Sequence, residues 1–166
     1  HGSNILGCVS FMIDELDAAL DVMFHTAIEN GFDLDFHVDE ATDPAARSLE
    51  RIAAAAIRHR FQGKILCGHC CSEDEKRIIG LVREAGIAVV SLPMCNMYLQ
   101  DRRAGRTPRW RGVTSLHELK AAGVPVMVSS DNTRDPFYAY GDLDTLEVFR
   151  EATRIGHFDH PFGDWP

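Results

Sequence analysis

The chain alternates short apolar runs with longer segments of helical periodicity, and this alternation is the strongest constraint on its fold. The apolar runs are predicted strands at residues 7–11, 34–38, 64–68, 87–92 and 124–128. Apolar residues recur at helical spacing in residues 13–30, 44–60, 72–85, 114–122 and 143–155. A strand–helix repeat of this kind requires parallel strands joined by right-handed crossovers. The sequence therefore predicts an α/β fold with a parallel βα repeat.

Boundary residues support this division of the chain. Pro44 suits the first position of a helix, and Ser72 followed by Glu75 predicts a capped helix start. Residues 94–112 and 131–141 have no regular period, so both are predicted to be long loops. Long loops in compact domains are often functional.

Composition excludes several classes of partner. The net charge of −8 argues against nucleic acid, because phosphate binding requires a basic surface. No apolar run reaches the roughly 18 residues that span a bilayer, and no signal peptide is visible. We therefore expect a small-molecule ligand, no nucleic-acid or membrane partner, and a cytoplasmic location. Assembly into a homo-oligomer is compatible with the sequence.

The five cysteines are expected to be reduced. Their number is odd, and Cys67 and Cys70 form a C-x-x-C without the second pair that a zinc ribbon needs. Mostly buried thiols in a reducing compartment are the simplest interpretation.

Five parallel strands are compatible with two architectures. One is a doubly wound open sheet, and the other is the later part of an eight-stranded barrel. The chain has 166 residues and begins at His1 rather than Met, whereas a complete barrel typically needs about 250 residues. On the barrel interpretation, residues 1–166 form a single α/β segment of an incomplete TIM barrel, and the N-terminal part of the barrel lies outside this chain.

Three polar side chains follow three of the predicted strands. His37, His69 and Asp131 each lie where a strand gives way to a loop, and in both architectures ligands bind outside the carboxyl ends of the strands. Imidazole and carboxylate ligands suit one divalent ion such as zinc or iron. Such an ion lowers the pKa of a bound water to about 7. The strand ends therefore predict a metal-assisted hydrolytic site.

Glu40 is the candidate proton carrier, because it lies close to His37 in sequence. The alternative is that Glu40 or Asp39 caps the helix that follows.

The strand ends also resemble a known family. The stretches are His37-Val38-Asp39-Glu40, His69 after a strand, Pro93-Met94-Cys95-Asn96-Met97-Tyr98-Leu99-Gln100 and Ser130-Asp131-Asn132-Thr133-Arg134-Asp135-Pro136-Phe137-Tyr138. In this order they resemble the cytosine deaminase branch of the amidohydrolase superfamily. The resemblance implies a metal-dependent (β/α)8 barrel, with this chain carrying about strands four to eight, and a hydrolase that removes an amino group from a cyclic amidine.

The resemblance also implies roles for individual residues. His37 and Asp131 would be metal ligands, and Asp131 would in addition act as a base. His69 would orient the attacking hydroxide, and Glu40 would carry the proton to the ring nitrogen. The positions expected to contact the substrate are Asn96, Asn132 and Phe137.

The chain departs from the family pattern in ways that bear on its metal and its substrate. The H-x-H that supplies two further metal ligands in the family is absent from the sequence. Asn132 and Phe137 stand where cytosine deaminase has an Asp and a Trp, and an amide presents a different hydrogen-bonding edge from a carboxylate. Cytosine is therefore not favoured over a pterin or another aminated heterocycle.

Two further functions stay open at this point. The same metal site could cleave a ring amide or an exocyclic N-alkyl group. Outside enzymes, a five-stranded flavodoxin-like binding domain would also fit the repeat, although no G-x-G-x-x-G phosphate loop is present.

Overall fold

The computed structural model of the chain describes residues 4–43, 45–71, 76–109 and 111–160. Its strands are β1 (Ile5–Val9), β2 (Asp33–Val38), β3 (Ile65–His69), β4 (Ile87–Ser91) and β5 (Val126–Val128). Its helices are α1 (Leu16–Asn30), α2 (Ser48–Arg58), α3 (Lys76–Glu84), α4 (Pro93–Leu99), α5 (Leu116–Ala121) and α6 (Thr145–Gly156).

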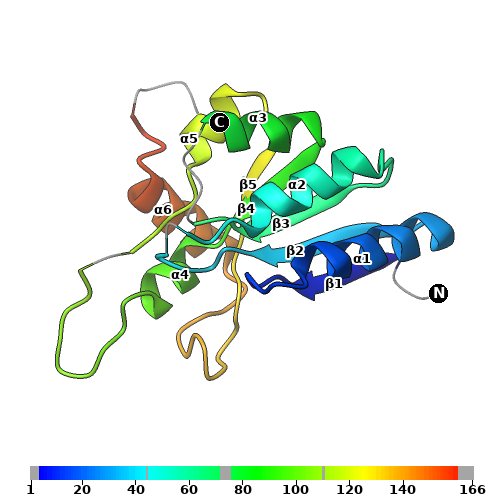
Figure 1. Cartoon of the computed structure of the whole chain (residues 1–166). Helices are drawn as coiled ribbons and strands as arrows, with labels where there is room; N and C mark the ends of the chain where they lie inside the picture. The colour runs from blue at the N-terminus through cyan, green and yellow to red at the C-terminus, as the bar shows by residue number, and fades with distance from the viewer. Residues whose placement is uncertain (1–3, 44, 72–75, 110, 161–166) are drawn as a thin grey trace.

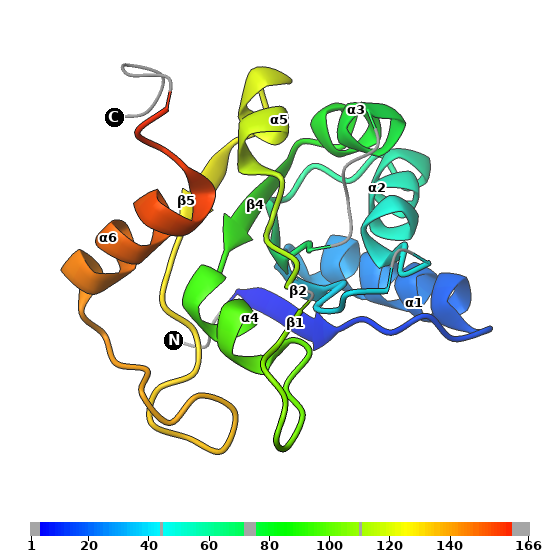
Figure 2. The ribbon, with the colours of Figure 1, turned by 90° about the vertical axis from the view of Figure 1, so that its left-hand side faces the viewer.

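The five strands form one parallel sheet in the order β1-β2-β3-β4-β5. Each strand therefore pairs with its predecessor, and the order never reverses. Helices α1, α2, α3 and α5 follow one another along one face of this curved sheet (Figures 1 and 2). A flavodoxin-like sheet reverses its strand order and carries helices on both faces. The sequential order excludes that alternative and is typical of a barrel segment.

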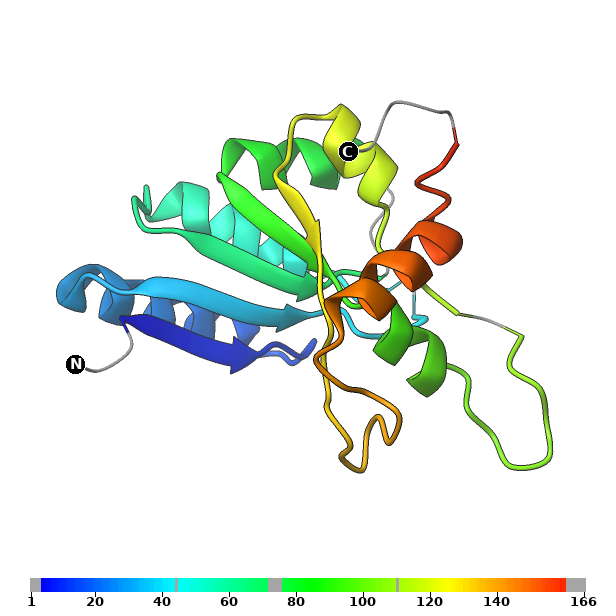
Figure 3. The same cartoon turned by 180° about the vertical axis from the view of Figure 1, so that it is seen from behind.

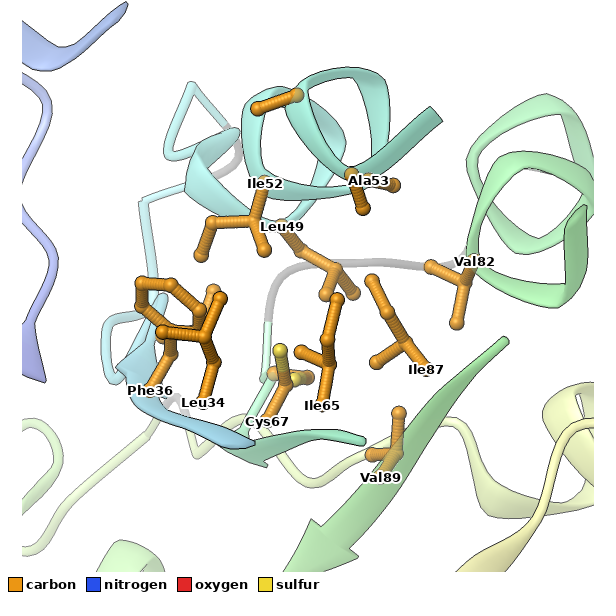
Figure 4. Close-up of a cluster of buried hydrophobic side chains, with 14 of the residues drawn as sticks. Leu34, Phe36, Leu49, Ile52, Ala53, Ile65, Cys67, Val82, Ile87 and Val89 are labelled. Carbon is orange, nitrogen blue, oxygen red and sulfur yellow. The ribbon is translucent and has the colours of Figure 1, made fainter. Parts of the chain in front are cut away.

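The core lies between the sheet and these helices. Figure 4 shows Phe36 and Leu34 of β2 packed beneath Ile52 of α2, with Val89 of β4 nearby, and all four are buried. Side chains alternate across a strand, so burying Leu34 and Phe36 places His37 on the opposite face. Figure 3 views the sheet from behind, on the side away from these helices. His37 is exposed, as is Val9 of β1, which pairs with it.

One predicted loop is partly wrong. Residues 93–99 form α4, with Pro93 in the first turn, although residues 94–112 were expected to be irregular. The apolar period is hidden because a polar residue, Asn96, occupies a buried position of this short helix. The second predicted loop, residues 131–141, contains no helix or strand in the structure. Helix α4 lies at the carboxyl ends of the strands (Figure 1).

Asp39 caps α2 from a distance. Its carboxylate accepts hydrogen bonds from the backbone N–H groups of Ser48, at 3.0 Å, and Leu49, at 2.9 Å. These are unsatisfied donors at the helix N-terminus, where negative charge is also favoured by the helix dipole. Asp39 is therefore the capping residue that the sequence could not distinguish from Glu40. The helix begins at Ser48, later than expected, and the proposed starts at Pro44 and Ser72 lie outside the described residues.

No disulfide joins the cysteines, all of which lie in the described residues, and most of them are buried. Burial raises the pKa of the Cys71 thiol to about 12 and that of Cys67 further still. Among the described residues, no helix has the length and apolarity needed to cross a membrane.

The cap predicts a specific loss of stability. Replacing Asp39 by Ala leaves two buried backbone N–H groups unpaired and puts a β-carbon without a polar group at a φ of 47°. We expect Asp39→Ala to lower the free energy of unfolding by about 2 kcal/mol, measured by urea denaturation. Asp43→Ala, which removes an exposed carboxylate from the same loop, should change it by less than about 0.5 kcal/mol. Equal losses in both variants would contradict the capping role.

A candidate active site at the strand ends

The structure brings together the three side chains predicted at the strand ends. His69 Nε2 lies 3.3 Å from His37 Nδ1 and 4.0 Å from Asp131 Oδ2. In the pairing of β2 with β3, Val38 lies opposite His69, and His37 is the residue just before Val38. Asp131 arrives from the segment that follows β5, two strands further along the sheet. The site is thus assembled from the carboxyl ends of three different strands, β2, β3 and β5.

His69 occupies the centre of this group. Its side chain is fully buried, and both His69 and Cys70 adopt left-handed backbone angles, with φ values of 70° and 50°. Such angles are unusual for residues other than glycine and often occur at functional sites. The carbonyl of His69 accepts a hydrogen bond from Thr114 Oγ1, which anchors the turn. Burial lowers the pKa of His69, with Asp131 acting in the opposite direction. Burial thus disfavours the charged form of the ring.

Glu40 lies beside His69, as expected of a proton carrier. Its Oε2 is 3.6 Å from His69 Nε2, and 34% of the side chain is exposed. Burial and the nearby charge of Asp131 raise the pKa of Glu40. Because Asp39 caps α2, the Glu40 carboxylate is not required there. Glu40 is thus a carboxylate with a raised pKa that reaches both the site and solvent.

Asn96 enters the site from α4. Its side chain is fully buried, with Nδ2 2.9 Å from His69 Nδ1 and 3.4 Å from Glu40 Oε1. The expected substrate contact of Asn96 stays a prediction. Its observed neighbours are His69 and Glu40, the two residues predicted to orient the attacking water and to carry the proton.

Asn132 and Phe137 lie in the loop that follows β5. The Asn132 amide donates to Asp135 Oδ2 at 2.8 Å and accepts from Cys95 Sγ at 3.2 Å. Asp135 also accepts from the backbone N–H groups of Phe137 and Tyr138, and these donors lower its pKa. Phe137 is 60% exposed. The loop is therefore internally ordered, and the substrate contacts expected for Asn132 and Phe137 stay predictions.

Cys95 is a candidate ligand that the sequence analysis missed. One ligand atom each of Glu40, Cys95 and Asp131 lies within 4.8 Å of the others. Burial, followed by the effect of Asp131, raises the pKa of the Cys95 thiol, which opposes the thiolate that a metal would need. In the sequence, Cys95 directly precedes Asn96, which was already predicted to belong to the site, and this neighbour relation could have identified Cys95. The donors gathered here, imidazole, carboxylate and thiol, are those that zinc and similar ions accept.

A cavity of about 410 Å³ opens beside His37 and Glu40. Its walls come from residues 9–12, which follow β1, and from several residues of the segment 39–48, which follows β2. This volume falls within the range of about 300–1,000 Å³ that is usual for small-molecule sites. His37 and Glu40 therefore border a space large enough for a heterocycle, whereas His69 and Asp131 are not among its lining residues.

Comparisons with known proteins agree on one group of enzymes. A model described as the amidohydrolase family matches residues 9–162. A relative described as a pterin deaminase, from Rhizobium rhizogenes (strain K84 / ATCC BAA-868), is 61% identical over 97% of this chain and 38% of its own length. N-isopropylammelide isopropyl amidohydrolase from Pseudomonas sp. (strain ADP) is 24% identical over 81% of this chain and 31% of its own length.

A solved structure is also similar. The 5-methylcytosine deaminase from Klebsiella pneumoniae, bound to phosphonocytosine, superposes with a TM-score of 0.83 at 28% identity. The match covers 94% of this chain and 40% of that enzyme. The chain thus spans well under half the length of the relatives it matches.

Proposed function

Because this chain belongs to the amidohydrolase family, we propose that it carries catalytic groups of a metal-dependent hydrolytic deaminase whose substrate is a pterin or a closely related aminated heterocycle. The resemblance expected from the strand ends is confirmed by the family match, and the parallel sheet superposes on part of a 5-methylcytosine deaminase. The convergence of His37, His69 and Asp131, with Glu40 beside them, is the observation that supports this function most directly.

The proposed chemistry divides between binding and proton transfer. His37 and Asp131 would hold one divalent ion, zinc or iron, which would supply an acidified water when bound. The Asp131 carboxylate would accept a proton from the attacking water, and His69 would orient that water through Nε2. Glu40 would deliver a proton to the ring nitrogen, since a carboxyl group with a raised pKa is suited to both accept and donate. The water oxygen would then add to the ring carbon, and Asp131 would pass the proton it accepted to the exocyclic amino group. As the C–N bond breaks and ammonia leaves, the new hydroxyl would form the C=O bond and return a proton to Glu40.

A pterin is favoured over cytosine by two observations. The relative at 61% identity is described as a pterin deaminase, whereas the 5-methylcytosine deaminase is 28% identical. In addition, Asn132 presents an amide rather than a carboxylate, so the substrate edge that it meets can be a donor, an acceptor or both.

A second candidate function is cleavage of an exocyclic N-alkyl group. It is supported by the N-isopropylammelide isopropyl amidohydrolase, which is 24% identical over most of this chain. The same residues would act, and only the leaving group would differ.

Substrate class can be tested by ammonia release from the full-length protein. We expect release from pterins, with kcat/KM for cytosine at least about 100-fold lower because the two substrates differ in the groups that meet the pocket. An N-alkylated aminotriazine serves as the comparison for the second function. Amine release from that compound, without ammonia release from any ring, would refute the deaminase proposal.

The ligand assignment can be tested by metal analysis. We expect His37→Ala and Asp131→Ala each to lose most bound zinc or iron, because each removes one of the proposed ligands. His25→Ala, which removes an exposed histidine of α1, should keep its metal. Cys95→Ser should also keep it. Loss in Cys95→Ser with retention in His37→Ala would move the ion to the Glu40, Cys95 and Asp131 cluster and contradict our assignment.

The role of Glu40 predicts a kinetic defect without a binding defect. Glu40→Gln keeps the size of the side chain and removes its ability to transfer a proton, so kcat should fall by about 100-fold to 10,000-fold. Metal content should stay the same. Glu29→Gln, an exposed position on α1, is the matched control. A Glu40→Gln enzyme within about threefold of the parent kcat would exclude Glu40 as the proton carrier.

A further inference from the structure

We infer that Asn96 is a positioning residue whose amide donates to His69 Nδ1 and so leaves the ring hydrogen of His69 on Nε2. In this tautomer His69 donates a hydrogen bond into the site and is not itself a metal ligand. The catalytic consequence rests on the proposed function, whereas the tautomer can be measured without any substrate.

The Asn96 amide has two acceptors in front of its nitrogen. Nδ2 lies 2.9 Å from His69 Nδ1 and 3.4 Å from Glu40 Oε1. An amide nitrogen carries two hydrogens, so each acceptor can receive one of them. The carboxylate of Glu40 cannot donate when ionised, and it therefore selects the amide orientation that points nitrogen toward it.

The reversed orientation of the amide is unfavourable for two reasons. It would place Oδ1 against the Glu40 carboxylate, bringing two acceptors together. It would also move the NH2 group to the place where Oδ1 now has no hydrogen-bond partner among the described residues. Asn96 is fully buried, and leaving donors unpaired in such a position costs about 1–3 kcal/mol. The observed orientation is therefore the one that the surroundings support.

This orientation determines where the His69 proton lies. A ring nitrogen that accepts a hydrogen bond carries no hydrogen, so Nδ1 is unprotonated and the neutral ring has its hydrogen on Nε2. Nε2 faces His37 Nδ1, Glu40 Oε2 and Asp131 Oδ2, at 3.3, 3.6 and 4.0 Å. His37 Nδ1 lies within hydrogen-bond distance and can accept, whereas the two carboxylate oxygens lie just beyond that distance. The centre of the site therefore receives an N–H from His69.

The pattern is opposite to that of a metal ligand. Histidines that bind metals through one ring nitrogen usually donate the hydrogen of the other nitrogen to a carboxylate or carbonyl oxygen. Here the outer nitrogen of His69 receives a hydrogen from an amide instead. The contact with Asn96 thus gives His69 the role of a hydrogen-bond donor, whereas His37 is the proposed metal ligand, although both are imidazoles at adjacent strand ends.

The backbone around Asn96 keeps the amide in place. Asn96 lies in the first turn of α4, where its N–H donates to Leu92 O at 3.1 Å and its carbonyl accepts from Gln100 N at 3.0 Å. Pro93 begins the same turn with a restricted φ. A side chain held on a short, buried helix has few ways to adapt, which suits a positioning role.

The direct test is the ¹⁵N NMR spectrum of the histidine rings in the metal-free, otherwise unmodified protein, with His69→Gln used to assign the His69 signals. We expect a pyrrole-type shift for Nε2 and a pyridine-type shift for Nδ1. A pyrrole-type Nδ1, or two protonated nitrogens, would overturn the inference. This measurement requires neither turnover nor metal, so it distinguishes failure of the tautomer from failure of the proposed function.

Asn96→Asp then reverses the polarity at constant shape. Its carboxylate accepts where the amide donated, so the His69 proton should move to Nδ1 in the same spectrum. With active enzyme, kcat should fall about 100-fold while KM changes less than about threefold, because the donor to the attacking water is lost. Gln100→Glu places a carboxylate at the C-cap of α4, where the side chain accepts from Gly112 N, and should leave the His69 tautomer as it is. An unchanged tautomer in Asn96→Asp would refute the role of Asn96.

Discussion

The parallel pairing of β2 with β3 is the interaction on which the site depends. Backbone hydrogen bonds continue past the ends of both strands, from Cys70 N to Val38 O at 2.9 Å and from Cys71 N to Asp39 O at 3.2 Å. These bonds hold the segment that carries Glu40 against the turn that carries His69. Because successive parallel strands end at the same edge of the sheet, His37 and His69 meet there without any long side-chain reach.

The helices matter to the site through the faces that they bury. Covering one face of β2 with α1 and α2 commits Leu34 and Phe36 to the core and turns His37 the other way. The cap from Asp39 to α2 then fixes the start of the loop next to Glu40. Asp39 and Glu40 are thus neighbours in sequence whose side chains point in different directions. Asp39 caps α2, and Glu40 lies beside His69.

Most buried polar atoms of the site are compensated by hydrogen bonds or charges, and among the described residues Asn96 Oδ1 is an exception. Within the described residues, His69 contacts Asn96 through one nitrogen and faces the acceptors of the site through the other. This buried network restricts each group to one arrangement, because moving one member leaves another unpaired. Such restriction is what a hydrolytic site needs, since the attacking water and the proton carrier must be aligned before the reaction begins.

Local periodicity alone predicts the βα repeat, most of the strands and the positions of His37, His69 and Asp131 at strand ends. Three further features follow from how the chain packs: the strand order is sequential, Asp39 rather than Glu40 caps α2, and α4 brings Asn96 and Cys95 to the site. These depend on contacts between segments far apart in the chain. Asn96 shows the reason most clearly, because a buried amide disrupts the apolar pattern of its own helix and is explained only by the histidine and the carboxylate that it meets.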